Sequence, residues 1–434
     1  MKRIILLVAA ALLLAGPRVE ACSSVIISGR ATADGRPLML KVRDESGQNN
    51  NIQYFTGEKY NYLGFVGDAS RPHEKVRSIV GGMNEAGLCT MSLTSNSWSK
   101  ENLPKTKHGN FQMVALSRCR NIAEMDAMFE EWGRPLGQVF NLGVIDAEGG
   151  AAYYEFDGEW YTKYDVNDPE VAPDGWRVLT NFSWAGDAEG SGGWDRYFSA
   201  EAMMKDFPKN AEGKYELTAQ DLYEAFGRRY RHELIGIKSI DDLSGYPYFC
   251  DQGMISRHQT CGILTFQGVR PGENPKYSVM WTQLGFPGSC PAIPLFACGG
   301  NQVPDYIWKE GTKSSRLCDK SFEVRNKFVY DKTWTGRLSY FNVAALNRVI
   351  GCIRGTEATI RGDFFPRYEA WRSAPAEEAI RLGIKDGVKV PRKKAAKLAA
   401  FETENDAKFY AEYRAALQGY YTRYLADLKA AGLE

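Results

Sequence analysis

Residues 19–29, VEACSSVIISG, join the end of a predicted export signal to the first predicted strand. Two basic residues near the start of the chain precede an apolar run from residue 4 to 16. Small residues stand three and one positions before the bond that follows Ala21. An apolar run this short, with such flanks, is typical of an export signal and not of a membrane span. Cleavage of that bond leaves a chain that begins with Cys22.

A cysteine at a free N-terminus carries both a nucleophile and a base, because its own α-amine can accept the proton of the thiol. The reference pKa values of an α-amine, about 8, and of a thiol, about 8.5, are well matched for this transfer. No histidine is then needed beside the thiol. The sequence therefore predicts that Cys22 is a nucleophile that carries its own base.

Two other interpretations of Cys22 stay open at this point. A cysteine directly after a signal can be the lipid-modified residue of a bacterial lipoprotein, and the protein is then a lipid-anchored, non-catalytic surface protein. Glu20 stands where such a signal has a small uncharged residue, and Pro17 and Arg18 interrupt the apolar approach, so lipidation is disfavoured. Cys22 can also form a disulfide, as cysteines of exported proteins often do.

The composition describes a large, nearly neutral protein. Removing 21 of the 434 residues leaves 413, enough for a large core, and changes the formal net charge from +1 to −1. A surface of this kind gives no electrostatic argument for a nucleic acid or an anionic membrane as partner. The 10 Trp, 23 Tyr and 21 Phe residues fit a β-rich protein, and no second apolar stretch is long enough to span a bilayer.

The nine cysteines and four histidines limit the covalent and metal chemistry. An even number of cysteines remains when Cys22 is set aside, which predicts disulfides in an exported protein. The shortest spacings suggest Cys250 with Cys261 and Cys290 with Cys298, although the sequence does not fix the connectivity. No spacing resembles a zinc site, so the sequence predicts no metal, and it predicts no cofactor.

Strand and helix patterns along the chain predict an α+β protein with a layered sheet core and a helical C-terminal extension. Strands are predicted at 23–29, 37–42, 88–93, 139–145, 151–156, 160–164, 177–180, 259–267 and 276–284, with a tight turn at 81–87. Helices are predicted at 111–132, at 196–207 and beyond about residue 370. The predicted division is a signal at 1–21, a main domain at 22–370 and a helical extension at 371–434.

Several short motifs follow Cys22 in order along the chain. They are Lys41 and Asp44 at the end of a strand, GGMNEAGL at 81–88, Thr94 at the end of the next strand, Leu-Thr-Asn ending at Asn181, and Arg196 at the start of a helix. In this order the motifs resemble the Ntn hydrolases, in particular the choloylglycine hydrolases, penicillin V acylases and acyl-CoA:6-aminopenicillanic acid acyltransferases. The resemblance covers residues 22–300 and implies a four-layer αββα sandwich.

The resemblance also implies a role for each motif residue. Cys22 attacks the amide carbonyl, and Asp44 holds and polarises its α-amine. Asn181 donates its side-chain N–H to the oxyanion, together with a backbone N–H near Thr94, and such donors act mainly in the transition state. Arg196 orients Asp44 or the amine.

Two positions depart from the family pattern. Lys41 stands where the family has arginine and lacks the bidentate fork of that side chain. The neighbouring Arg43 is the alternative, and the gapless alignment favours Lys41. Thr94 stands where the family usually has asparagine, and Asn96 is the alternative there.

The resemblance implies an exported amidohydrolase, periplasmic or secreted, that cleaves a linear amide through a thioester, with acyltransferase activity as a related outcome. Its partner is a small-molecule amide, and the family often forms homo-oligomers. The opening residues also resemble the Ntn cysteine dipeptidases, so a dipeptidase is the alternative enzyme. The lipid-anchored protein described above is the non-catalytic alternative.

Overall fold

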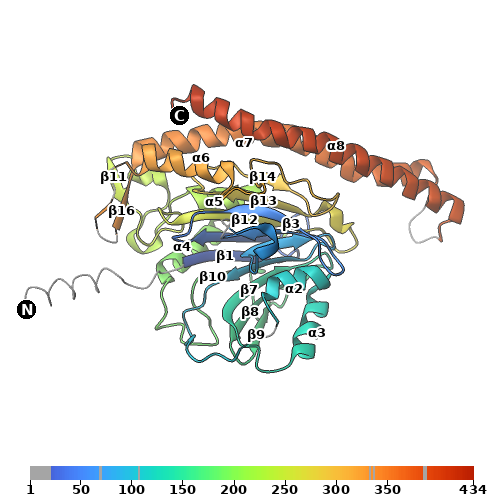
Figure 1. Ribbon diagram of the computed structural model, residues 1–434, viewed down its shortest axis with the longest axis horizontal. Helices are drawn as coiled ribbons and strands as arrows, with labels where there is room; N and C mark the ends of the chain where they lie inside the picture. The colour runs from blue at the N-terminus through green and yellow to red at the C-terminus, as the bar shows by residue number, and fades with distance from the viewer. Residues whose placement is uncertain (1–20, 68–70, 106–107, 332–333, 336–337, 385–388) are drawn as a thin grey trace, which may run out of the picture.

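The computed structural model describes residues 21–67, 71–105, 108–331, 334–335, 338–384 and 389–434. Two antiparallel sheets face each other at the centre of the molecule, and helices cover the outer face of each sheet (Figure 1). The prediction of an α+β, four-layer αββα sandwich with a helical C-terminal region is therefore confirmed. The predicted signal lies outside the described residues except for Ala21, the first residue of the first strand.

The first sheet has the strand order β10-β1-β2-β12-β13-β14. Its strands are β1 (Ala21–Ile27), β2 (Leu38–Asp44), β10 (Trp176–Leu179), β12 (Thr260–Gln267), β13 (Val279–Leu284) and β14 (Ile293–Leu295). The predicted hairpin is present, because β1 and β2 pair from Ala21 with Asp44 to Ile27 with Leu38. Every residue of β1 and β2 is buried, since the second sheet covers one face and helices cover the other.

The second sheet pairs its strands in chain order. They are β3 (Asn51–Phe55), β4 (Tyr62–Val66), β5 (Gly81–Asn84), β6 (Cys89–Leu93), β7 (Val139–Ile145), β8 (Ala151–Asp157) and β9 (Tyr161–Asp165). The predicted meander is confirmed as β7 to β9. The predicted tight turn at 81–87 is wrong in its first half, which is β5. A Cβ on Gly82 would lie 2.3 Å from the carbonyl oxygen of Leu63, so this glycine permits close strand packing.

The outer layers are short helices on either side of the two sheets. On the second sheet lie α2 (Phe111–Arg118) and α3 (Ile122–Trp132), and on the first lie α4 (Trp194–Asp206), α5 (Ala219–Arg228) and α6 (Arg316–Val324). The single helix predicted at 111–132 is wrong, because Asn121 starts a new helix and its side chain accepts the backbone N–H of Glu124. A small third sheet contains β11 (Tyr248–Cys250), β16 (Leu338–Asn342) and β15 (Trp334–Thr335).

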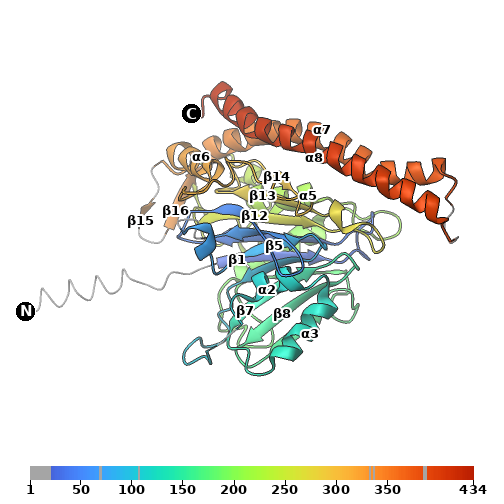
Figure 2. The same cartoon turned by 45° about the vertical axis from the view of Figure 1, so that its right-hand side comes forward.

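Two long helices, α7 (Val343–Arg381) and α8 (Arg392–Ala430), pack side by side above the first sheet and extend past the sandwich at one end (Figures 1 and 2). The boundary predicted at residue 370 falls inside α7, so the helical region starts at Val343. The Trp371 and Phe409 rings stack between the two helices, with centroids 3.9 Å apart. Within the described residues, no helix combines the length and the apolar character that crossing a membrane requires.

The predicted disulfides are absent from the structure. All nine cysteines lie in the described part of the chain, and all nine are free thiols. Two of the suggested partners contact other groups: the Cys261 thiol lies 2.9 Å from Nη1 of Arg43, and the Cys298 thiol lies 3.4 Å from the carbonyl oxygen of Glu85. Neither of the two suggested pairs is bonded in the structure.

Candidate active site

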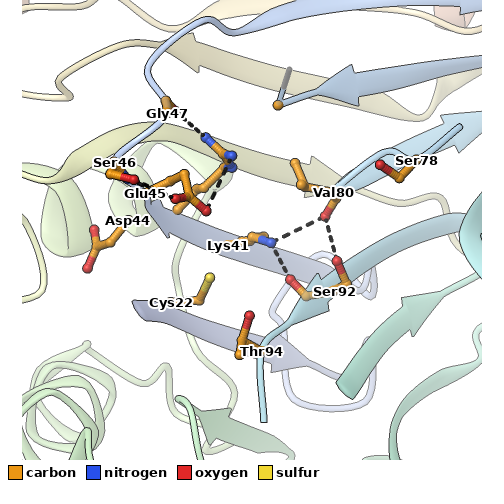
Figure 3. Close-up of a pocket in the computed structure, with 12 residues that line it drawn as sticks. Cys22, Lys41, Asp44, Glu45, Ser46, Gly47, Ser78, Val80, Ser92 and Thr94 are labelled. Atoms are coloured by element: carbon orange, nitrogen blue, oxygen red, sulfur yellow. Dashed lines mark hydrogen bonds and ion pairs between the residues drawn. The ribbon is translucent and has the colours of Figure 1, made fainter. Parts of the chain in front are cut away.

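Cys22 is the second residue of β1, where the first sheet borders a cavity of about 400 Å³. Its side chain is only 5% exposed, and it lines the cavity. Figure 3 shows Cys22 facing Lys41, with Thr94 nearby on the facing sheet. The other lining residues are Arg43, Asp44, Glu45, Ser46, Gly47, Gly67, Ser78, Val80 and Ser92. The thiol is thus close to a space that a small molecule can enter.

Asn181 lies beside Cys22 because of the pairing between β1 and β10. Ser24 is opposite Leu179 in that pairing, and continuing the antiparallel register places residue 181 opposite residue 22. The side-chain oxygen of Asn181 accepts the backbone N–H of Cys22 at 2.8 Å, and its Nδ2 donates to the carbonyl oxygen of Thr94 at 2.9 Å. The structure therefore brings together three of the predicted residues, one in β1 and the other two just after the ends of β10 and β6.

Arg196 joins the same cluster from α4. Its Nη2 donates to the side-chain oxygen of Asn181 at 2.8 Å, and its Nη1 donates to the carbonyl oxygen of Cys22 and to Ser23 Oγ. Burial, together with the nearby Arg257, lowers the pKa of Arg196 to about 10, so its guanidinium stays charged at neutral pH. Arg196 fixes the orientation of the Asn181 amide, since an oxygen that accepts two N–H groups cannot exchange places with the NH₂ group.

Asp44 ends β2 and faces Ala21 across the β1–β2 pairing. Its Oδ1 accepts the hydroxyl of Thr260 at 2.6 Å, and its Oδ2 accepts Nε of Arg257 at 2.8 Å. Within the described part of the chain, Asp44 forms no hydrogen bond or ion pair with Arg196, which the resemblance gives as one of its two possible partners. Arg257 is the arginine that holds Asp44.

Arg257 is a site residue that the sequence analysis missed. It lies in the loop before β12, and Asp44 is 213 positions away along the chain. Burial acts to lower the pKa of Arg257, but the carboxylates of Asp44 and Asp251 outweigh it and the net shift is upward. The only signal in the sequence is an arginine shortly before a predicted strand, and that signal is too common to select it.

Lys41 and Arg43 occupy the same face of β2, because side chains two residues apart in a strand point the same way. Lys41 Nζ donates to the backbone carbonyl oxygens of Ser92 and Val80 on the facing sheet (Figure 3). Arg43 is directly opposite Cys22 in the β1–β2 register. Both side chains therefore line the cavity, and the two alternatives from the sequence are both present in one site.

Thr94 and Asn96 differ in position although both follow β6. Thr94 lines the cavity and its carbonyl oxygen accepts from Asn181, whereas the Asn96 side chain is exposed and only its backbone N–H contacts residue 181, at 2.8 Å. Of the two alternatives, Thr94 is therefore the one that lies beside the cavity. Among the described residues no group of three or more His, Cys, Asp or Glu side chains could hold a metal ion.

Comparisons with known proteins give only distant structural likeness. No protein-family model matches the chain, and no curated protein matches it either. A mutant of conjugated bile acid hydrolase from Clostridium perfringens is 14% identical, with a TM-score of 0.38, over 64% of this chain and 93% of that one. Penicillin V acylase from Agrobacterium tumefaciens is 13% identical, with a TM-score of 0.37, over 69% of this chain and 96% of that one. At these TM-scores the likeness carries no weight for function, which rests on the site itself.

Proposed function

We propose that the protein is an exported hydrolase, periplasmic or secreted, that cleaves a linear amide C–N bond with Cys22 as an N-terminal nucleophile. The observation that carries this proposal is the position of Cys22 beside a cavity, with its backbone nitrogen hydrogen-bonded to Asn181 and with Ala21 facing Asp44. Cleavage after Ala21 removes the residue that faces Asp44. The new α-amine of Cys22 would then form beside the buried carboxylate of Asp44. That carboxylate would hold the amine in place to act as the base.

The proposed reaction has two halves that share one proton carrier. Cys22 Sγ adds to the amide carbonyl carbon while the α-amine takes the thiol proton, and the C–N bond then breaks as that proton passes to the leaving nitrogen. A thioester remains. Water adds to its carbonyl carbon while the α-amine takes a proton, and the C–S bond breaks as the proton returns to sulfur. An amine in place of water gives acyl transfer.

The oxyanion would be stabilised by Asn181 and a backbone N–H near Thr94. The Asn181 amide has two hydrogens, and Thr94 accepts from Nδ2. The second hydrogen is the proposed oxyanion donor. Arg196 would serve as a positioning residue, because it holds the oxygen of the same amide at 2.8 Å.

The test is mass spectrometry of the purified mature protein, before and after brief exposure to amide substrates. A free N-terminal Cys22 that gains one acyl mass, reversed by hydroxylamine, is the expected result. A substrate panel of acyl-amino acids, penicillin V, bile-acid conjugates and dipeptides then separates an acylase from the alternative dipeptidase. An N-terminus that carries lipid chains would establish the anchor alternative and contradict the proposal.

A further inference from the structure

Among the described residues, the cavity beside Cys22 is lined mainly by polar and charged side chains, with Val80 as the one lining residue of aliphatic type. Binding sites for small molecules are usually lined mainly by apolar side chains with a few polar groups. A cavity of this kind favours a substrate whose entering part is itself polar. The charge that this part of the substrate carries then depends on the charged residues of the cavity wall, which are Lys41, Arg43, Asp44 and Glu45.

Arg43 lines the cavity, and its two terminal nitrogens differ in their contacts. Nη1 lies 2.9 Å from Asn50 Oδ1, 2.9 Å from the Cys261 thiol and 3.3 Å from the carbonyl oxygen of Gly47. Nη2 lies 3.9 Å from Oε2 of Glu45, a distance that fits an ion pair but is too long for a hydrogen bond. The Arg43 side chain is only 9% exposed, so it is held in place by the protein around it.

Gly67 leaves the space that this nitrogen occupies. A Cβ on Gly67 would lie 2.6 Å from Arg43 Nη2, and Gly67 lines the cavity. Any larger residue at position 67 would push the guanidinium away from its present position. The Arg43 guanidinium is thus held in place through Nη1, and Gly67 leaves room for Nη2. The two hydrogens of Nη2 have no hydrogen-bond acceptor among the described residues.

We infer that Arg43 Nη2 binds a carboxylate of the substrate, so the amide that the protein cleaves carries a carboxylate in the part that enters the cavity. This inference rests on the proposed function. A guanidinium is the side chain best suited to a carboxylate, because its N–H groups match the carboxylate geometry. Glu45 is the competing internal anion, because its carboxylate already lies 3.9 Å from Nη2. A substrate carboxylate binds only where it approaches Nη2 more closely than Glu45 does.

The experiment compares matched substrates that differ only in charge. N-acyl amino acids and their carboxamides place the charge on the leaving amine, whereas N-succinyl and N-butyryl derivatives of one amine place it on the acyl group. The wild-type protein is expected to cleave the acid of one pair at a higher kcat/KM, and the pair that shows the preference identifies the side of the bond. Arg43→Lys is expected to reduce that preference roughly ten- to a hundredfold, mainly through KM.

Two further variants keep the test independent of folding defects. Gly67→Ala keeps every charge but displaces Nη2, so it should reduce the acid preference in the same direction. Glu45→Gln removes the competing anion and should increase it. Equal losses for the acid and for its neutral partner in Arg43→Lys would show a structural role and overturn the inference. Wild-type cleavage of both pairs without acid preference overturns the inference alone, whereas no cleavage and no acylation of Cys22 contradict the proposed function itself.

Discussion

The centre of the sandwich and the α7–α8 hairpin are both buried, but they bury different kinds of side chain. Around Cys22 the buried residues include Lys41, Asp44, Asn181 and Arg196, whose polar atoms are hydrogen-bonded. Burying such groups costs free energy even when they are paired. A catalytic role accounts for keeping these polar groups buried despite their free-energy cost. We therefore expect changes at the centre to affect turnover more than stability.

The hairpin buries aromatic rings that contribute mainly packing. Trp371 stacks on Phe409, and Phe296 of the sandwich contacts the rings of both residues. Hydroxyl groups of α8 donate to sandwich carbonyl oxygens, for example Tyr413 to Pro294 at 2.6 Å and Tyr424 to Ser289 at 2.7 Å. Aromatic pairs add to stability beyond their buried area. Changes in the hairpin should therefore affect unfolding and leave turnover intact.

The largest expected effect at the centre is that of Cys22→Ser. The change removes one thiol from a strand whose neighbours stay in place, so we expect loss of nearly all amide cleavage with little change in the unfolding midpoint. Kinetics and thermal unfolding of the same preparation measure both, after the N-terminus has been confirmed by mass spectrometry. Full activity in a correctly processed variant would remove Cys22 from the mechanism.

An uncleaved residue before Cys22 should have nearly the same effect without changing any side chain. Ala21 is 1% exposed and paired with Asp44 inside β1, so a chain that keeps it can still fold. Its Cys22 nitrogen is then an amide and cannot accept a proton. We expect a folded, inactive protein whose turnover returns when a specific protease exposes Cys22. Equal rates before and after that cleavage would mean that another group is the base.

Asn181→Ala should lower kcat far more than it raises KM, because an oxyanion donor acts mainly in the transition state. The expected loss is roughly a hundredfold to a thousandfold. Thr94→Val is the matched change on the facing strand, where it keeps the shape and the backbone, and its effect should be much milder. If both variants lost the same activity, the hydroxyl of Thr94 would have a role of its own.

The comparison also explains what the sequence could predict. Cys22, Asn181 and Arg196 lie in short motifs, and the β1–β2 hairpin is local, so these parts were predictable from neighbouring residues. The pair of Asp44 and Arg257 depends on the pairing of β2 with β12, in which Asp44 is opposite Thr260. No local pattern encodes a register between strands that are so far apart in the chain.

The errors outside the site have local physical causes. The glycine pair at 81–82 is typical of a turn, but in the structure these residues leave room for neighbouring strands. The helical region is predicted beyond about residue 370, but α7 already begins at Val343, where the Asn342 side chain accepts the backbone N–H of Ala345. The first error arises where close packing of neighbouring strands overrides the turn preference of the glycines.

In the hairpin, Trp371→Ala should cost about 3–5 kcal/mol of unfolding free energy, because it removes a buried ring from an aromatic cluster. The kcat of the folded variant should stay at the wild-type value. Urea unfolding monitored by circular dichroism measures the first, and kinetics at a permissive temperature measure the second. Arg367→Ala, a partly exposed position on the same helix where the side chain pairs with Asp363, is the control and should change the unfolding free energy by less than about 1 kcal/mol. A drop in kcat for Trp371→Ala would mean that the hairpin shapes the active site.

The smallest expected effect tests the same separation with a single atom. Tyr424 is fully buried and its hydroxyl donates to the carbonyl oxygen of Ser289 at 2.7 Å. Tyr424→Phe leaves that carbonyl without this donor and should cost about 1 kcal/mol of unfolding free energy, with no change in kcat. Tyr421→Phe on the same helix is the matched control, since its hydroxyl lies 3.3 Å from the carbonyl oxygen of Arg316 and the residue is 9% exposed. Its cost should be smaller. Equal costs would show that neither the length of the hydrogen bond nor the burial of the residue sets what each hydroxyl contributes to docking α8 on the sandwich.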